Sequence, residues 1–507
     1  MLSSTIPLVR TGSIPKQTRD LRRCRLEQRF PFFQMSSQSY ADAISGPGPH
    51  GVPELSGVLP DGPERGVPSS ARETTEVVMP AAHELIIVSC YTRFDNLAHG
   101  PRGTEARRSL YTFCLDKNDG ELVLFSVTTD DSVMNPAFSR FDSQRNLLYT
   151  CTESVAEPGE IVTYSVDPRT GKLVKLGCQC AGGTSTCYLT LDKESKNMLV
   201  VNYWNATIGV FGIDSDSGVV GEAKSVYDPN SGKGMKVSYT KHVNHSENDT
   251  HAQKERQSDP HSHAVILDPY FGKIAYVPDL GMDLIRQFRF NPQSGTLEAA
   301  GTCRSGPESK SLGPRYIEFH PTLPFAYVVN ELSSEVSVFQ FDHQAAERLL
   351  SSSDPSKEES TLRLVQTVRT IPDAWPGDMN TCGRITVHKS GHFVLVSNRG
   401  HNSITIFRVH HELGSQGLLS LAHLQHTRGA TPRHFQFDSS GQWLISANQD
   451  SDTISVFRFN IATGAMEWTG NEYHVPSPNF VCSARPQMRL SARAQASREG
   501  AMPLSRL

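Results

Sequence analysis

A ten-residue repeat constrains the fold of this chain more than any other feature of its sequence. Each copy begins with Asn or Asp, has Ile or Val at its seventh position and ends with Phe. The copies begin at Asn202, Asp279, Asn330, Asn398 and Asn448. The last two copies start 50 residues apart, which we take as the base spacing, and longer loops separate the others. A recurring period of this length is typical of proteins built from repeated structural units.

Short runs of alternating apolar and polar residues precede each copy. Before Asn330 they read YIEFHP and PFAYVV, and before Asn448 they read FQFDSS and QWLISA. A polar or glycine-containing turn follows each copy, often with a weaker fourth run. Alternation with a period of two, broken by Gly, Asp and Ser, predicts antiparallel strands joined by hairpins. Each unit is therefore expected to be a meander of four strands, and no comparably long stretch shows the period of a helix.

Two weaker copies, one from His83 and one from Pro136, bring the count to seven. Seven four-stranded units predict an all-β fold, a seven-bladed β-propeller. A β-sandwich or several small β domains would not repeat one frame this faithfully. The first unit lacks an innermost strand before His83, while a spare segment, 478–482, follows the seventh unit. We expect that segment to pair into the first blade and close the ring, because an open ring leaves unpaired strand edges.

The two ends of the chain differ from its middle. Residues 1–34 hold seven Lys or Arg against two acidic residues, which is typical of an organelle transit peptide; the alternative is an unstructured extension with Met35 as the working start. Residues 36–78 are rich in Gly, Pro and Ser, and the segment after Arg485 is polar and basic. Such segments bury too little apolar surface to offset chain entropy. We predict a disordered or targeting extension (1–79), a propeller (80–484) and a disordered tail (485–507). The expected location is cytoplasmic, or a plastid or mitochondrion if residues 1–35 are a transit peptide.

Composition excludes several partners. Lys and Arg total 49 against 53 Asp and Glu, so no positive field exists to collect phosphate backbones, and we expect no nucleic-acid partner. No apolar run reaches the roughly 18 residues of a membrane span. Ten scattered cysteines without a CxxC pair indicate buried, reduced thiols. We expect no metal, because His242, His245 and His251 in the polar insertion 228–258 have no Cys or carboxylate at ligand spacing. We also expect a monomer.

The repeat also predicts which side chains meet. In a meander, the start of the first strand and the end of the second lie at the same rim of the ring. Counting back 15 residues from the first residue of the repeat gives the start of the first strand. The second residue of the repeat opens the loop between the second and third strands. This count places Cys187, Arg315, Gly383 and Arg433 at strand starts, and Tyr203, Leu280, Glu331, Arg399 and Gln449 at the loop positions of the same rim. In the fourth unit the turn between the first two strands is one residue longer, which places His263 at the strand start, and the loop position of the second unit is Glu153.

Three Arg, one His and one Glu at a shared rim favour an anion site with an acid–base pair. Arg binds carboxylate or phosphate with paired donors, and Glu or His can activate water. Taken alone, Arg315 and Glu331 could instead form an ion pair that holds two blades together. We expect both side chains to line a wet cavity, so that replacing either would leave the fold stable.

The residues around these positions resemble the lactonase family of seven-bladed propellers, which includes propeller-type 6-phosphogluconolactonases and fungal cis,cis-muconate-lactonizing enzymes. The resemblance covers about residues 83–484 and rests on RQSDPHSHAVILDP, GPRYIEFHP, YVVNELSSEVSVF, LVSNRGHNSITIF and TPRHFQFD. It implies a catalytic cluster of His263, Arg315, Glu331 and Arg399. We assign substrate binding to His261, Glu153, Arg384 and Arg433. Cys187 and Arg384 depart from the family pattern, which leaves the exact substrate open.

The resemblance implies a lactone hydrolase without a cofactor, with 6-phosphogluconolactone of the pentose phosphate pathway as the expected substrate. Water would attack the ring carbonyl, Glu331 or His263 would take its proton, and arginines would stabilise the oxyanion. Two alternatives stay open. One is a muconate-type cycloisomerase, which needs the same arginines and one acid, and the other is a non-catalytic propeller that binds sugars or proteins.

Overall fold

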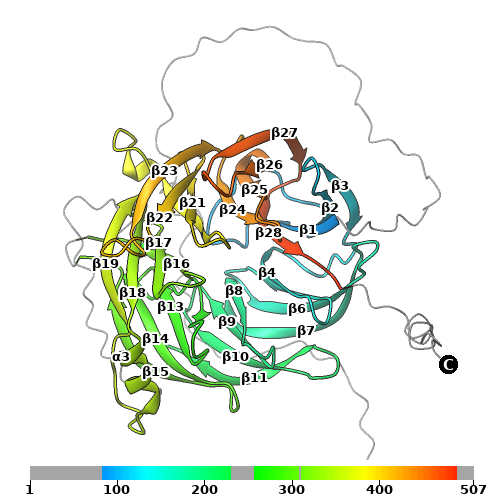
Figure 1. The fold of residues 1–507 in the computed structure, drawn as a ribbon. Helices are drawn as coiled ribbons and strands as arrows, with labels where there is room; N and C mark the ends of the chain where they lie inside the picture. The colour runs from blue at the N-terminus through cyan, green and yellow to red at the C-terminus, as the bar shows by residue number, and fades with distance from the viewer. Residues whose placement is uncertain (1–82, 230–255, 308–309, 488–507) are drawn as a thin grey trace, which may run out of the picture. The chain divides into compact units, whose positions relative to one another are not determined.

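The computed structural model describes residues 83–229, 256–307 and 310–487. Their strands form seven four-stranded antiparallel sheets, arranged around a ring as in Figure 1. The all-β, seven-bladed propeller predicted from the repeat is therefore confirmed.

The blades are numbered along the chain, and each is given from its innermost to its outermost strand. Blade 1 contains β28 (Pro478–Ala484), β1 (His83–Cys90), β2 (Leu110–Asp116) and β3 (Leu122–Val127), and blade 2 contains β4 (Pro136–Asp142), β5 (Leu147–Thr152), β6 (Pro158–Val166) and β7 (Leu173–Thr184). Blade 3 contains β8 (Thr186–Leu191), β9 (Asn197–Asn202), β10 (Ile208–Ile213) and β11 (Val220–Tyr227), and blade 4 contains β12 (Ile266–Leu267), β13 (Ile274–Asp279), β14 (Leu284–Asn291) and β15 (Thr296–Arg304). Blade 5 contains β16 (Pro314–Phe319), β17 (Phe325–Asn330), β18 (Glu335–Phe341) and β19 (Leu362–Arg369), and blade 6 contains β20 (Thr381–Val387), β21 (Phe393–Arg399), β22 (Ser403–Val409) and β23 (Leu419–His426). Blade 7 contains β24 (Pro432–Phe437), β25 (Trp443–Asn448), β26 (Thr453–Phe459) and β27 (Met466–His474).

The C-terminal strand closes the ring as predicted. Strand β28 pairs antiparallel with β1, with Leu85 opposite Ala484 and Val88 opposite Val481. In Figure 1 the red strand β28 lies beside the blue strand β1. The Val88 and Val481 side chains are fully buried, so closure covers the inner edge of β1 and adds to the apolar core.

In three copies, the first residue of the repeat joins its blade to the one before it, whereas Asp279 and Asn330 bond to Arg286 and Ser337 of their own blades. The Asn448 amide donates to the carbonyl of Thr427, which follows the outer strand of blade 6, and the Asn398 amide donates to the carbonyl of Thr370, which follows that of blade 5. Asn202 likewise donates to Ala181 of blade 2. These buried amides thus satisfy backbone carbonyls between blades. The Phe that ends each copy is also buried, which explains the rest of the pattern.

One helix was not predicted. Helix α3 (His343–Ser351) lies between β18 and β19 of blade 5. The Asp342 carboxylate accepts a hydrogen bond from the Ala345 amide at 3.0 Å and caps the helix, and Ala346 and Leu349 pack into the core of the blade. Nine residues are too few for a sustained helical period to stand out in the sequence. Two short 3-10 turns, η1 (Gly377–Met379) and η2 (Gln449–Ser451), lie in loops.

Nine cysteines fall in the described ranges, and all are free; six are buried, while Cys178 on β7 is exposed, contrary to expectation. Within these ranges no helix is long and apolar enough to cross a membrane, and no group of three His, Cys, Asp or Glu is placed to hold a metal. Cys24, residues 1–82, the histidines of the insertion and residues 488–507 lie outside the described residues, so the predictions for them stay predictions.

Candidate active site

The starts of the innermost strands meet at one rim, which we call the mouth of the ring. A cavity at this rim is lined by the second residue of five of these strands: Ala137, Cys187, Arg315, Arg433 and Asn479. In blade 4 the short strand β12 begins further along, and His263 occupies this place beside an isolated bridge from Ser262 to Asp279. Tyr91 and Glu153 enter the lining from the loops that follow the second strands of blades 1 and 2.

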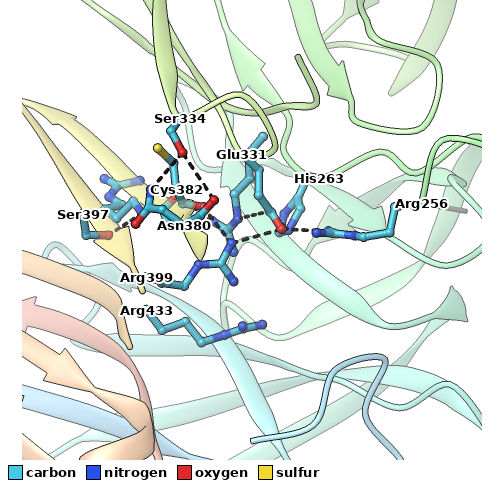
Figure 2. Close-up of polar contacts among 12 residues, drawn as sticks. Arg256, His263, Glu331, Ser334, Asn380, Cys382, Ser397, Arg399 and Arg433 are labelled. Atoms are coloured by element: carbon cyan, nitrogen blue, oxygen red, sulfur yellow. Dashed lines mark hydrogen bonds and ion pairs between the residues drawn. The ribbon is translucent and has the colours of Figure 1, made fainter. Parts of the chain in front are cut away.

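Three arginines share the carboxylate of Glu331. The Arg256 Nη2 atom lies 2.7 Å from Oε1, the Arg399 Nη2 atom lies 3.0 Å from the same oxygen, and Arg315 donates from Nε to Oε2 at 2.9 Å. Figure 2 shows Arg256 and Arg399 reaching Glu331 from opposite sides. His263 completes this group, which we call the Glu331 cluster, with its Nε2 atom 4.0 Å from Oε2.

Backbone carbonyls of blade 6 hold two of these arginines in place. The Arg315 Nη1 atom donates to the carbonyl of Gly383 at 3.0 Å, and the Arg399 Nη2 atom donates to the carbonyl of Cys382 at 2.7 Å. Arg315 is the second residue of β16 in blade 5, so its side chain ties the two blades together. The geometry of these two arginines is therefore set by the sheets.

The cluster keeps Glu331 ionised. Burial by itself raises the pKa of the Glu331 carboxyl, but the three guanidinium groups hold that pKa well below its usual value of 4.5. The same crowding of charge acts on Arg399, since burial and the neighbouring guanidinium groups lower its pKa to about 10. Both groups therefore carry their charges at neutral pH.

His263 is uncharged at neutral pH. Burial lowers its pKa well below the usual 6.5, and Arg315 adds to the shift, while Glu331 opposes it. On the side of the imidazole away from Glu331, the Cys187 Sγ atom lies 3.7 Å from His263 Nδ1. The Cys187 thiol also donates to the His263 backbone carbonyl at 3.5 Å. Burial raises the pKa of the Cys187 thiol, so Cys187 is a neutral neighbour and not a thiolate.

A second polar group faces the cavity from blades 1, 2 and 7. The Tyr91 hydroxyl donates to Glu153 Oε2 at 2.8 Å, and the Arg433 Nη2 atom lies 3.9 Å from the same oxygen. The Arg433 guanidinium also lies over the Tyr91 ring, 5.4 Å from its centroid.

Two predicted residues have other partners than Glu331. His261 stacks on the Tyr203 ring, with centroids 4.8 Å apart. The Tyr203 hydroxyl in turn accepts a hydrogen bond from Arg256 Nη2. Arg384 forms an ion pair with Glu318 at 2.9 Å. Glu318 lies three residues further along β16 than Arg315. Arg384 therefore lies deeper between the innermost strands than the cluster at the mouth.

A family model described as "Lactonase, 7-bladed beta-propeller" matches residues 86–483. This chain belongs to the lactonase family of seven-bladed β-propellers. It is 28% identical to the 6-phosphogluconolactonase of Bacillus subtilis over 344 residues, which span 68% of this chain and 86% of the relative. It is 27% identical to the 6-phosphogluconolactonase of Formosa agariphila, over 71% of this chain and 90% of the relative. The periplasmic gluconolactonase of Pseudomonas aeruginosa has the same fold, with a TM-score of 0.62, 23% identity and coverage of 79% of this chain and 99% of that one.

Two residues of the site of this lactonase-family protein, Arg256 and Tyr91, were not predicted from the sequence. Arg256 opens the stretch RQSDPHSHAVILDP, but it precedes His263 by seven residues and falls outside the repeat frame. Tyr91 occupies the loop position of blade 1, where the repeat is too weak to align. If the first unit had been aligned to the others by the spacing of its strands, Tyr91 would have been predicted at the loop position. No position of the repeat corresponds to Arg256.

The environment of Arg315 and Glu331 also differs from the expected wet cavity. Only about 4% of each side chain is exposed. The space at the mouth, including the part that opens to solvent, is about 280 Å³. Arg315 and Glu331 are therefore buried at the mouth and do not line a water-filled cavity.

Proposed function

We propose that this lactonase-family protein hydrolyses a sugar-acid lactone, with 6-phosphogluconolactone as the substrate. The observation that carries the proposal is the neutral imidazole of His263 next to a carboxylate that three guanidinium groups keep ionised. The names of the two relatives from Bacillus subtilis and Formosa agariphila support the choice of substrate.

His263 is the better candidate for the general base. A carboxylate with a strongly lowered pKa has little affinity for a proton, and Glu331 also has its oxygens occupied by arginine donors. The His263 imidazole is uncharged and can accept the proton of the attacking water. The imidazolium that forms is stabilised by Glu331, as in other pairs of His and a carboxylate, and returns the proton to the ring oxygen that leaves.

The arginines have different roles in this proposal. Arg315 donates hydrogen bonds to Glu331 and to the Gly383 carbonyl, so it positions the carboxylate. Arg399 keeps a buried Nε atom without a hydrogen-bond partner among the described residues, and Arg433 lies 3.9 Å from Glu153 and over the Tyr91 ring. These two cations are therefore the candidates for binding the developing oxyanion and the phosphate or carboxylate of the substrate.

The test is an assay of the purified full chain for acid release from freshly made 6-phosphogluconolactone, with a panel of muconates alongside. We expect hydrolysis above the spontaneous rate, and we expect His263→Gln to lower it by about 10²–10⁴-fold. His423→Gln, on the exposed strand β23, is the matched control and should leave the rate unchanged. Activity on muconates alone would indicate a cycloisomerase in place of the proposed hydrolase. No activity on either substrate would favour a binding module.

The location of the protein is a separate proposal. We propose a cytoplasmic protein, with import into a plastid or mitochondrion as the alternative that the basic segment 1–35 suggests. Fusing residues 1–35 to a fluorescent reporter distinguishes the two, because an import signal would carry the reporter into the organelle.

A further inference from the structure

Below the mouth, aromatic side chains form a layer across the ring. In five of the innermost strands the third residue carries an aromatic ring: Phe138, Tyr188, Tyr316, His434 and Phe480. Between ring centroids, Phe138 lies 4.2 Å from Tyr188 and 4.5 Å from Phe480, and Tyr188 lies 5.2 Å from Tyr316. His434 packs on Phe480 with centroids 3.9 Å apart. Tyr316, His434 and Phe480 also line the cavity at the mouth, so the layer is the floor of that cavity.

Blade 6 contributes an arginine to this layer instead of an aromatic ring. Gly383 of β20 packs against the carbonyl of Arg433 in β24. The residues that follow these two, Arg384 and His434, therefore lie side by side on neighbouring strands. The guanidinium carbon of Arg384 lies 5.7 Å from the centroid of the Tyr316 ring, on its other side. Arg384 thus fills the part of the layer between blades 5 and 7.

His434 has a hydrogen-bond donor without an acceptor. Its Nδ1 atom accepts from the Val481 amide at 3.2 Å, so that nitrogen carries no proton. Burial lowers the pKa of His434 well below 6.5, and four arginines lower it further, Arg384 the most. The neutral imidazole therefore carries its proton on Nε2. This Nε2 atom is buried and has no hydrogen-bond partner among the described residues.

Arg384 also has donors without acceptors. Its Nη2 atom forms the ion pair with Glu318, whereas its Nε and Nη1 atoms are buried and have no hydrogen-bond partner in the described part of the chain. The Tyr188 hydroxyl is a polar neighbour of Arg384, but it already accepts from Arg140 Nη2 at 3.1 Å. A phenol oxygen has two acceptor positions at most, so at least one Arg384 nitrogen keeps no acceptor.

These neighbouring groups select a negatively charged ligand. Both the His434 imidazole and the Arg384 guanidinium can only donate, so neither can satisfy the other. Buried donors without acceptors cost free energy unless a ligand accepts from them. The arginines that lower the pKa of His434 make this place electrically positive, which favours an anion over a neutral acceptor. The cavity at the mouth reaches His434 and gives such an ion a route from solvent.

We propose that His434 and Arg384 hold a small inorganic anion the size of chloride in the floor of the mouth. The ion accepts hydrogen bonds from both side chains and offsets part of the repulsion between the arginines around it. Aromatic rings surround the place, so a spherical ion suits it better than a branched organic anion. The site is separate from the reaction and does not depend on the proposed lactone hydrolysis.

Thermal melts of the full chain test the site in solution. At constant ionic strength, exchanging methanesulfonate for chloride should raise the melting temperature until it saturates, because a ligand that binds only the folded state stabilises it. Arg384→Met and His434→Phe should each raise the chloride concentration for half the effect by at least about tenfold. Arg363→Met, on the outer strand β19, is the matched control and should respond as wild type. The same response in every variant, or no saturable rise in wild type, would overturn the site.

Bromide diffraction locates the ion. Crystals of the full chain grown in sodium bromide should give an anomalous peak within hydrogen-bonding distance of His434 Nε2 and Arg384, and Arg384→Met crystals should lack that peak. A water molecule at this place in wild type, or bromide only beside Arg399 and Arg433 at the mouth, would overturn the site. Neither measurement uses a lactone, so the proposed hydrolysis can fail while the anion site stands.

Discussion

Among single residues, Glu331 connects more of the site than any other side chain described above. It receives three guanidinium groups that come from blade 5, from blade 6 and from the segment before blade 4. Removing its charge would leave those cations buried without a counter-charge. The residue that orders the proposed site is therefore also one that holds blades together.

We expect Glu331→Gln to affect both activity and stability. The substitution keeps the shape but removes the charge, so the free energy of unfolding should fall by about 3–5 kcal/mol, the usual effect of breaking a buried pair. Turnover should fall on the order of 10²–10⁴-fold, because the imidazolium loses its carboxylate. Urea denaturation and the lactone assay measure the two effects. Glu335→Gln, whose carboxylate pairs with the half-exposed Lys310, is the control and should change both far less. An unchanged melt in Glu331→Gln would show that the arginines need no counter-charge.

The lowered pKa of His263 predicts the pH dependence of activity. A base works in its neutral form, and His263 stays neutral until the pH falls below its folded-state pKa, which lies well under 6.5. We therefore expect kcat/KM, corrected for spontaneous hydrolysis, to stay level from about pH 8 past pH 6.5 and to fall only in more acidic solution. An NMR titration of the His263 ring, assigned with His263→Gln, gives the pKa independently. A rate that halves at or above pH 6.5 would contradict the assignment of the base.

Among the structural elements, the innermost strands of blades 6 and 7 approach each other closely beside the site. A Cβ atom on Gly383 would lie 2.9 Å from the carbonyl of Arg433 and 3.2 Å from that of Pro432, both in β24. The Gly383 carbonyl also accepts the Arg315 bond. Glycine at this strand start lets the two innermost strands approach and holds the arginine in place.

Gly383→Ala should therefore separate the two blades. We expect the free energy of unfolding to fall by about 1–3 kcal/mol, as for other cases of overpacking, and the lactone assay to show reduced activity because Arg315 shifts. Gly377→Ala is the control, since a Cβ atom there meets nothing within 4 Å. Wild-type melting and activity in Gly383→Ala would mean that the strands tolerate the extra methyl group.

The sequence predicted the elements that have a local physical cause. Three of the five copies begin with an Asn that bonds to the preceding blade, and every copy ends with a buried Phe, so strand order and the shared rim follow from the spacing of the repeat. Contacts made by residues outside the repeat could not be predicted in this way. Arg256 contacts Glu331 from a segment before blade 4, and the loop that carries Tyr91 has no periodic pattern. Helix α3 depends on the Asp342 cap and on packing rather than on a long helical period.

For the molecule as a whole, the decisive contact is the pairing of β28 with β1. We expect a chain that ends at Ser477 to lose its single cooperative thermal transition, because the inner edge of β1 and its buried side chains become exposed. The reference is a chain that ends at Gln487 and keeps β28, so that both chains lack the same tail. Calorimetry compares the two, and equal transitions would show that six complete blades hold the first one in place.

The same pairing joins Leu85 to Ala484, at opposite ends of the described chain. Ribosomes add about 5–20 residues per second, so β1 leaves the ribosome roughly 20–80 s before its partner β28 is made. The other six blades are each built from consecutive strands and need no such delay. During synthesis β1 is thus an apolar strand with one open edge, available to chaperones and to incorrect partners. The yield of folded protein in a cell should therefore depend on the speed of translation and on chaperone supply.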